Sequence, residues 1–110
     1  MKNIAIDFDG VIHDFKNPVP GRKMGPPMEG TKEALQYFVD NGYRIIVFCR
    51  WAENPVKIET IRKYMEWWQL PFEEITNIKP DAVAYIDDRG IRFTGDWKDA
   101  IARFEYALEE

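Results

Sequence analysis

Short apolar runs alternate with amphipathic segments along the chain, and this alternation predicts the order of its strands and helices. Residues 4–6, 44–48 and 82–86 are three such runs, mainly apolar and containing β-branched side chains. Runs of this kind are typical of strands buried in a parallel sheet. Shorter strands are predicted at residues 74–76, on a sheet edge, and at 91–93. The pattern predicts an α/β fold of three layers, α/β/α, around a mainly parallel Rossmann-like sheet.

Amphipathic segments between the strands predict three helices. Thr31 is expected to cap a helix that runs to about Asn41, with Gly42 as the left-handed residue behind it. Residues 54–55, Asn-Pro, supply a cap and a first-turn proline for a second helix, and Asp96 is expected to cap a third. The apolar faces predicted for the three helices are Ala34, Leu35, Phe38 and Val39; Ile58, Ile61, Met65 and Trp68; and Trp97, Ile101, Phe104 and Leu108.

Residues 13–30 interrupt the alternation. Prolines and glycines recur through this stretch, so regular structure is not expected there. A loop of this length inside a small domain is usually functional or disordered. Because it leaves directly from the first strand, we interpret it as a flap over a site at the end of that strand. The alternative is a mobile surface loop that covers nothing.

The composition is that of an ordinary globular protein. The 110 residues suffice for one domain, expected to span residues 1–110, and 45% of them are hydrophobic. The net charge of −4 offers no broad basic surface, so stable nucleic-acid binding is not expected. Cys49 is the single cysteine, and no segment has the pattern of a signal peptide or a membrane span. We therefore expect a cytoplasmic protein without a membrane partner.

Two carboxylates, Asp7 and Asp9, follow the first strand two residues apart, and Gly10 comes directly after them. Side chains two apart on an extended segment point to the same side. Glycine at the next position lets the backbone turn sharply. Two adjacent carboxylates repel each other unless a cation or a shared proton lies between them. The pair therefore indicates a functional site, although a solvated strand end with Asp in a turn is the simpler alternative.

The same reasoning extends to the other strand ends. In a parallel sheet these ends meet at one edge, and ligands bind there near the point where the strand order reverses. Acidic oxygens gathered at one point suit Mg²⁺, and a lysine among them allows phosphate to bind beside the metal. The residues expected to converge are Asp7, Asp9, Cys49, Lys79, Asp87 and Asp88.

These residues carry a family resemblance. Residues 7–11, Asp-Phe-Asp-Gly-Val, resemble the first motif of the haloacid dehalogenase-like (HAD-like) superfamily of phosphohydrolases. Residues 79–80, Lys-Pro, resemble its third motif, and residues 85–88, Tyr-Ile-Asp-Asp, its acidic fourth motif. The matching elements span nearly the whole chain, and their flanks are similar to small phosphatase-like members from bacteria and phages. The family often inserts a cap domain, for which residues 13–30 leave room only for a flap.

The resemblance implies a Mg²⁺-dependent phosphomonoester hydrolase with a role for each matched residue. Asp7 would be the nucleophile that forms an aspartyl-phosphate and a metal ligand. Asp9 would protonate the leaving oxygen and then activate water, and its main-chain carbonyl would reach the metal. Asp87 would bind Mg²⁺ directly, and Asp88 would be a second ligand or an acceptor for a metal-bound water. Lys79 would neutralise charge on the phosphate and keep Asp7 ionised.

One position departs from the family pattern. The second motif usually ends a strand with Ser or Thr, and here that position is Cys49, a weaker donor. Phosphate would then be bound by backbone N–H groups or by Arg50, and the predicted substrate-binding set is Gly10, Cys49, Arg50 and Lys79. Alternatively, Cys49 is a small buried residue. Arg50 and Arg89 are each able to bind a substrate phosphate, and the alternative for either residue is a structural ion pair. We assign no chemistry to the single histidine, His13.

Two other functions stay open. Four carboxylates suit a metal-dependent nuclease or a phosphatase acting on nucleic-acid ends, and they also suit a receiver-like or degenerate phospho-binding module without turnover. The expected partner is a small phosphorylated metabolite or a phosphorylated polymer end. Tryptophans such as Trp51, Trp67 and Trp97 would serve as contacts if the chain forms a homo-oligomer.

Overall fold

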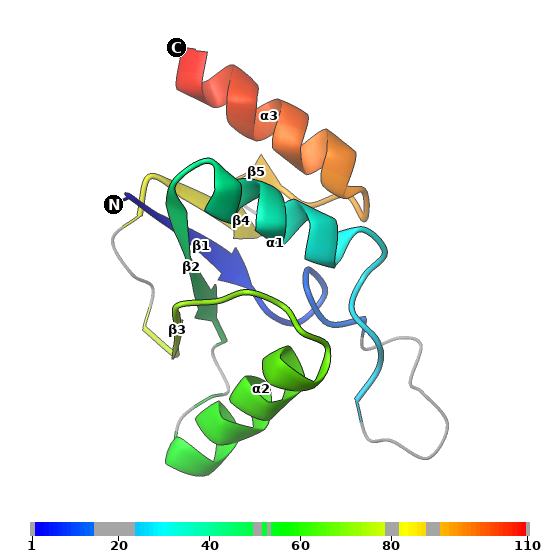
Figure 1. Ribbon diagram of the computed structural model, residues 1–110, viewed down its shortest axis with the longest axis vertical. Helices are drawn as coiled ribbons and strands as arrows, with labels where there is room; N and C mark the ends of the chain where they lie inside the picture. The colour runs from blue at the N-terminus through cyan, green and yellow to red at the C-terminus, as the bar shows by residue number, and fades with distance from the viewer. Residues whose placement is uncertain are drawn as a thin grey trace.

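The computed structural model describes residues 2–14, 24–49, 52, 54–78, 82–87 and 91–109, and for residues 87, 92 and 107–109 it describes the main chain alone. The described residues form a five-stranded sheet and three helices (Figure 1). In chain order the elements are β1 (Lys2–Asp7), α1 (Thr31–Asp40), β2 (Tyr43–Phe48), α2 (Pro55–Trp67), β3 (Glu74–Thr76), β4 (Ala84–Asp87), β5 (Ile91–Arg92) and α3 (Trp97–Glu109).

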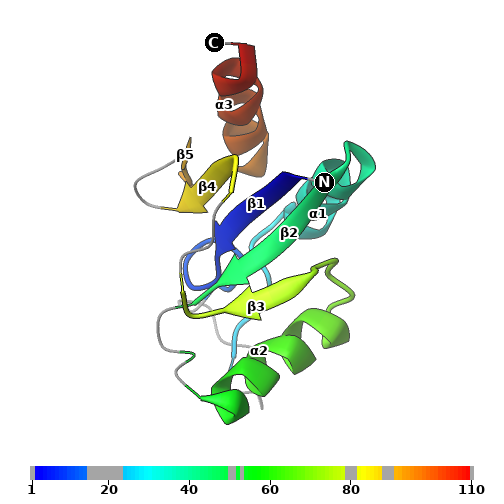
Figure 2. The same cartoon turned by 90° about the vertical axis from the view of Figure 1, so that its left-hand side faces the viewer.

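Every described strand pair in the sheet is parallel, and the strand order is β3-β2-β1-β4-β5 (Figure 2). The chain first builds outward from β1 through β2 to β3, and then returns to the other side of β1 for β4 and β5. The strand order therefore reverses at β1, and the gap between β1 and β4 is the switch point where α/β proteins bind ligands. The predicted α/β class with a parallel Rossmann-like sheet is confirmed.

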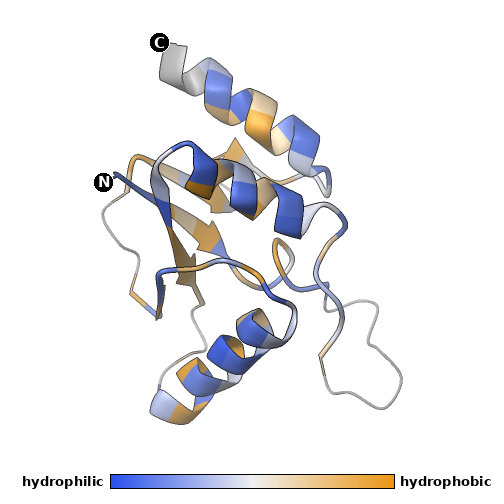
Figure 3. Cartoon of the chain, viewed as in Figure 1, coloured by the Kyte–Doolittle hydropathy of each residue, from blue (hydrophilic) through white to orange (hydrophobic). Residues whose placement is uncertain are grey.

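The central strands carry buried side chains on both faces of the sheet. On one face, Ile4 and Ile6 of β1 join a cluster that includes the buried side chains of all three helices. On the opposite face, Ala5 and Ile46 are also buried. Figure 1 shows α3 beside both α1 and β5, and α2 near β3 at the other end of the sheet. The strands are mainly hydrophobic, whereas the helices alternate hydrophobic and hydrophilic residues (Figure 3).

The ends of the helices match the sequence with one exception. Asn54 caps α2 by accepting from the main-chain N–H of Lys57, and the side chain of Asp96 accepts from the N–H of the residue two positions on, inside α3. Gly42 has φ 86°, the left-handed conformation expected behind α1. Thr31, however, does not cap α1. Gly30 occupies the cap position, and no side chain caps the helix. The Thr31 hydroxyl donates to the Met28 carbonyl instead (2.6 Å).

The remaining differences lie at element ends. β4 begins at Ala84, two residues later than the predicted 82–86 strand, and includes Asp87. β5 ends at Arg92, one residue early, whereas the edge strand β3 has the predicted bounds. Val39 is 39% exposed, so its place on the apolar face of α1 was wrong. The side chain of Leu108 lies outside the described part.

The two ends of the 13–30 segment pair with each other beside β1. The N–H of Asp14 donates to the carbonyl of Pro26 (2.9 Å), and the N–H of Met28 donates to that of Ile12 (2.8 Å). A short antiparallel bridge joins His13 to Pro27 between these bonds. The segment is therefore fastened at its base to the turn that follows β1. Residues 15–23, where a flap would extend, lie outside the described residues.

None of the helices in the described residues is both long enough and apolar enough to span a lipid bilayer.

Candidate site at the strand ends

The carboxyl ends of β1 and β4 bring two predicted site residues side by side. Ile6 of β1 pairs with Ile86 of β4, so Asp7 and Asp87 each occupy the next position on neighbouring parallel strands. Such strands lie about 4.8 Å apart. On its other side Asp7 pairs with Phe48 of β2, at the strand end that leads to Cys49. The main chain thus places three predicted positions at one edge, at the switch point of the sheet.

A tight turn after β1 carries the second carboxylate. The carbonyl of Phe8 accepts hydrogen bonds from the N–H groups of Ile12 (2.9 Å) and His13 (2.8 Å). The N–H of Gly10 donates to the carbonyl of His13 (2.9 Å), and Gly10 has φ 80°. A side chain at that backbone conformation would be strained, so glycine is required for this turn. The expected role of Gly10 in reversing the chain is confirmed.

The turn places Asp9 against His13. Oδ1 of Asp9 lies 2.8 Å from Nδ1 of His13, and the Asp9 side chain is 36% exposed whereas that of His13 is 9% exposed. The opposite ring nitrogen, Nε2, accepts a hydrogen bond from the main-chain N–H of Gly25 (3.0 Å). A nitrogen that accepts in this way carries no proton. His13 is therefore neutral with its proton on Nδ1, and that N–H donates to the carboxylate of Asp9.

Aromatic rings hold the imidazole in place. The ring of Phe8 stacks on that of His13 at 5.2 Å between centroids, and Tyr64 of α2 meets it edge-on at 5.5 Å. The hydroxyl of Tyr64 donates to the carbonyl of Gly25 (2.9 Å), the residue whose N–H binds His13. Burial raises the pKa of Tyr64, and the negative charges of Asp14 and Asp9 raise it further. Tyr64 thus stays a neutral donor at physiological pH.

Of the residues predicted to bind phosphate at the strand ends, the structure describes Cys49 but not Arg50 or Lys79. Cys49 follows β2, where its N–H donates to the carbonyl of Thr76 (2.9 Å), and its side chain is 2% exposed within the core. This burial favours the interpretation of Cys49 as a small buried residue over that of a phosphate donor. The other predicted residues at this edge lie outside the described residues: Arg50, Lys79, Asp88 and Arg89.

The carboxylates that the structure does describe suit the predicted ion by their chemistry. Mg²⁺ prefers hard oxygen ligands, which Asp7 and Asp9 supply. Within the described residues, no three His, Cys, Asp or Glu side chains lie close enough to hold a metal. The predicted ligand set extends past that part, since Asp88 lies outside it and the side chain of Asp87 is not described.

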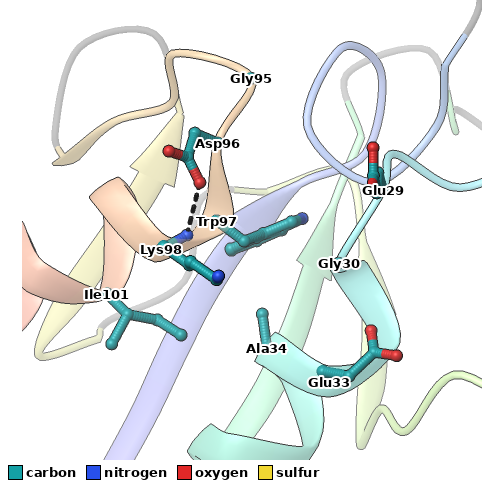
Figure 4. Close-up of a pocket in the computed structure, with 9 residues that line it drawn as sticks. All are labelled: Glu29, Gly30, Glu33, Ala34, Gly95, Asp96, Trp97, Lys98 and Ile101. Carbon is teal, nitrogen blue, oxygen red and sulfur yellow. Dashed lines mark hydrogen bonds between the residues drawn. The ribbon is translucent and has the colours of Figure 1, made fainter.

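A separate hollow of about 680 Å³ lies between the N-terminal ends of α1 and α3 (Figure 4). Glu33, Asp96 and Lys98 line it, and the indole of Trp97 points between the two helices. Nε1 of Trp97 donates to Oγ1 of Thr31 (2.8 Å), so this ring is a structural tie between α3 and α1. In the described part of the chain, the hollow shares no lining residue with the predicted site.

Sequence reasoning missed the partners of Asp9. The sequence assigns no chemical role to His13, and Gly25 and Tyr64 are not part of the predicted site. The only signal in the sequence was the spacing of Asp9 and His13 on either side of a glycine turn. The contacts of Gly25 and Tyr64 depend on how the segment and α2 fold back, which local pattern does not show.

The fold and the strand-end carboxylates together define an α/β protein with a Rossmann-like parallel sheet and an acidic edge at its switch point. No family model matches the chain, and no curated protein matches it. Two solved structures share the fold. A conserved protein from Bacteroides thetaiotaomicron has 23% identity and a TM-score of 0.64, over 99% of this chain and 92% of that one. A protein from Vibrio cholerae has 24% identity and a TM-score of 0.60, over 97% and 99% of the two chains.

Proposed function

We propose that the protein is a Mg²⁺-dependent phosphomonoester hydrolase of the HAD-like type, with Asp7 as nucleophile. The observation that supports this best is the pairing of Ile6 with Ile86, which puts Asp7 and Asp87 side by side at the switch point. The exposure of the Asp9 side chain next to them adds a group able to exchange protons with a ligand. The resemblance of residues 7–11 to the first motif of the family supplies the roles.

The mechanism follows from the two carboxylates of the first motif. A carboxylate oxygen of Asp7 attacks phosphorus in line, and the ester bond between phosphorus and the leaving oxygen breaks. Asp9 gives its proton to that oxygen, so the alcohol leaves neutral. In the second step Asp9 takes a proton from water, whose oxygen displaces Asp7 from phosphorus. Inorganic phosphate is released, and both carboxylates return to their starting states.

The proposed cofactor and the lysine supply positive charge. Mg²⁺ held by Asp7, Asp87, Asp88 and the main-chain carbonyl of Asp9 would balance the negative charge that gathers on the phosphoryl oxygens. Lys79 would contribute a second positive charge to the same oxygens. The substrate class is a small phosphorylated metabolite or a phosphorylated polymer end, since both present the same reacting group.

The test is hydrolysis of 4-nitrophenyl phosphate with Mg²⁺ by the wild type and three variants. Asp7→Asn is expected to reduce turnover to background, because the amide is not a nucleophile. Asp9→Asn is expected to lower kcat by about 10² to 10⁴, the usual contribution of general acid–base catalysis, because Asp9 also activates the water of the second step. Asp40→Asn, an exposed carboxylate at the end of α1, is the matched control and should retain full activity.

The same assay separates the alternatives. Hydrolysis of bis(4-nitrophenyl) phosphate in preference to the monoester would indicate the nuclease. A phosphoryl adduct on the intact protein that persists for minutes, without product release, would indicate the receiver-like module. Full activity of Asp7→Asn on the monoester would remove the nucleophile assignment. Circular dichroism of each variant checks that the fold is retained.

A further inference from the structure

His13 is buried, and both of its ring nitrogens form hydrogen bonds. Nδ1 donates to Oδ1 of Asp9, and Nε2 accepts from the N–H of Gly25. The donor at Nε2 is a main-chain N–H, which cannot reverse its role, so it selects the tautomer with the proton on Nδ1. A surface histidine would be free to exchange between tautomers. Here the fold itself fixes which nitrogen faces the carboxylate.

The Gly25 main chain is in turn held by the rest of the domain. Its carbonyl accepts from the hydroxyl of Tyr64, and the bridge between His13 and Pro27 fastens the same stretch to the turn. Phe8 and Tyr64 pack against the imidazole ring from two directions. A chain of contacts therefore leads from the core face of α2 through Gly25 and His13 to Asp9.

We propose that His13 is a positioning residue that orients the carboxyl group of Asp9 for proton transfer. The proposal rests on the hydrolase function proposed above, in which Asp9 is the general acid and base. The hydrogen bond from Nδ1 occupies Oδ1, so the transferable proton resides on Oδ2. In the first step Oδ2 gives this proton to the leaving oxygen, and in the second step Oδ2 takes one from water. His13 gains and loses no proton in either step.

This role predicts a dependence on the leaving group. An alkyl phosphate such as glycerol phosphate has a poor leaving group and needs the proton from Asp9. A 2,4-dinitrophenyl phosphate leaves readily as an anion and needs it little. Loss of positioning should therefore lower kcat/KM for the alkyl ester and spare kcat/KM for the activated one. This ratio reports the first step, whereas hydrolysis of the aspartyl-phosphate is common to both esters. A purely structural role for His13 would lower both rates alike.

Two amide variants each keep one of the two hydrogen bonds of His13 and remove the other. His13→Asn keeps a donor at the δ position for Asp9 and gives up the acceptor for Gly25. His13→Gln keeps an acceptor at the ε position for Gly25 and gives up the donor for Asp9. Each variant loses one bond and the aromatic ring, so the two are matched controls for stability, which urea unfolding checks.

We expect His13→Gln to lower kcat/KM for glycerol phosphate by about tenfold or more, within what a general acid contributes. It should change kcat/KM for the dinitrophenyl ester by less than about threefold. His13→Asn should restore most of the alkyl-ester rate. Equal losses on the two esters, or equal rates for the two variants, would overturn the positioning role. Wild-type protein inactive toward both esters would overturn the hydrolase proposal as well.

Nitrogen-15 NMR of the imidazole in the wild type gives a measurement that does not depend on activity or on the folding of a variant. Nδ1 is expected to carry the proton at neutral pH, and Nε2 to have the shift of an unprotonated nitrogen. A proton on Nε2 would overturn the proposal, because Asp9 would then receive no donor from His13.

Discussion

At the scale of single residues, the site depends on contacts that cross the chain. Gly25 and His13 are twelve positions apart, and Tyr64 is 39 positions from Gly25. The motif around Asp7 and Asp9 could be predicted because it is contiguous and because glycine has a specific conformational use there. The tautomer of His13 could not be predicted, because it is set by a main-chain N–H that only the folded 13–30 segment brings near.

The contact of Tyr64 with Gly25 can be measured through the pH dependence of the free energy of unfolding. An unfolded tyrosine ionises near pH 10. In the folded protein burial raises the pKa of Tyr64, so above about pH 10 the unfolded chain releases a proton that the folded chain still binds. By linkage, the contribution of Tyr64 to stability is complete below pH 10 and is lost as the pH rises toward the folded-state pKa.

The measurement is urea unfolding of wild type and Tyr64→Phe at several pH values from 8 to about 11. At pH 8 the variant should be less stable by about 1 kcal/mol, because the hydroxyl no longer bonds Gly25. Toward pH 11 the difference should shrink, since phenylalanine does not ionise in the unfolded state. Tyr106→Phe, at an exposed position on α3, is the control. A difference that grows with pH would contradict the assignment.

At the scale of elements, the sequence predicted what is decided locally and missed what neighbours decide. The caps at Asn54 and Asp96 and the left-handed Gly42 depend on residues within one turn, and they formed as expected. Thr31 failed as a cap because its hydroxyl donates to Met28 and accepts from the Trp97 indole, which belongs to α3. A tertiary partner thus overrode a good local signal.

Helix α2 connects a local cap to the site, since Asn54 begins the helix that carries Tyr64. Asn54→Ala removes the acceptor for the Lys57 N–H and is expected to lower the free energy of unfolding by about 1 kcal/mol. Asn54→Asp keeps an oxygen in the same place and should be nearly neutral. Urea unfolding of the three proteins measures both effects. An alanine variant as stable as the wild type would show that Pro55 and packing determine the start of the helix without the cap.

At the scale of the whole molecule, the order of the strands explains how residues far apart in the sequence reach one edge. The sheet could be predicted because each buried strand is a distinct apolar run, and the parallel direction of β1, β2 and β3 follows from the helices α1 and α2 between them. The convergence of Asp7 with Asp87 then needed no knowledge of side chains, because parallel strands in register align their ends. The direct partners of the carboxylates, by contrast, depend on side-chain packing at the turn.

An edge that gathers carboxylates should bind Mg²⁺ and be stabilised by it. Neighbouring carboxylates repel each other, and a cation bound between them offsets this repulsion. A ligand that binds the folded state alone adds about 2.7 kcal/mol at one hundred times its Kd. We therefore expect the unfolding temperature to rise with Mg²⁺ and to fall back when EDTA is added. Asp87→Asn should reduce the rise, whereas Asp40→Asn should keep it.

Ionic strength must be held constant with NaCl in this titration, because the net charge of −4 makes general screening stabilising as well. Screening acts on all the acidic residues, so it would raise the unfolding temperature of wild type, Asp87→Asn and Asp40→Asn equally. Binding at the strand ends acts through a few oxygens and must distinguish the two variants. An equal rise in both would assign the effect to screening and would count against Mg²⁺ at the switch point.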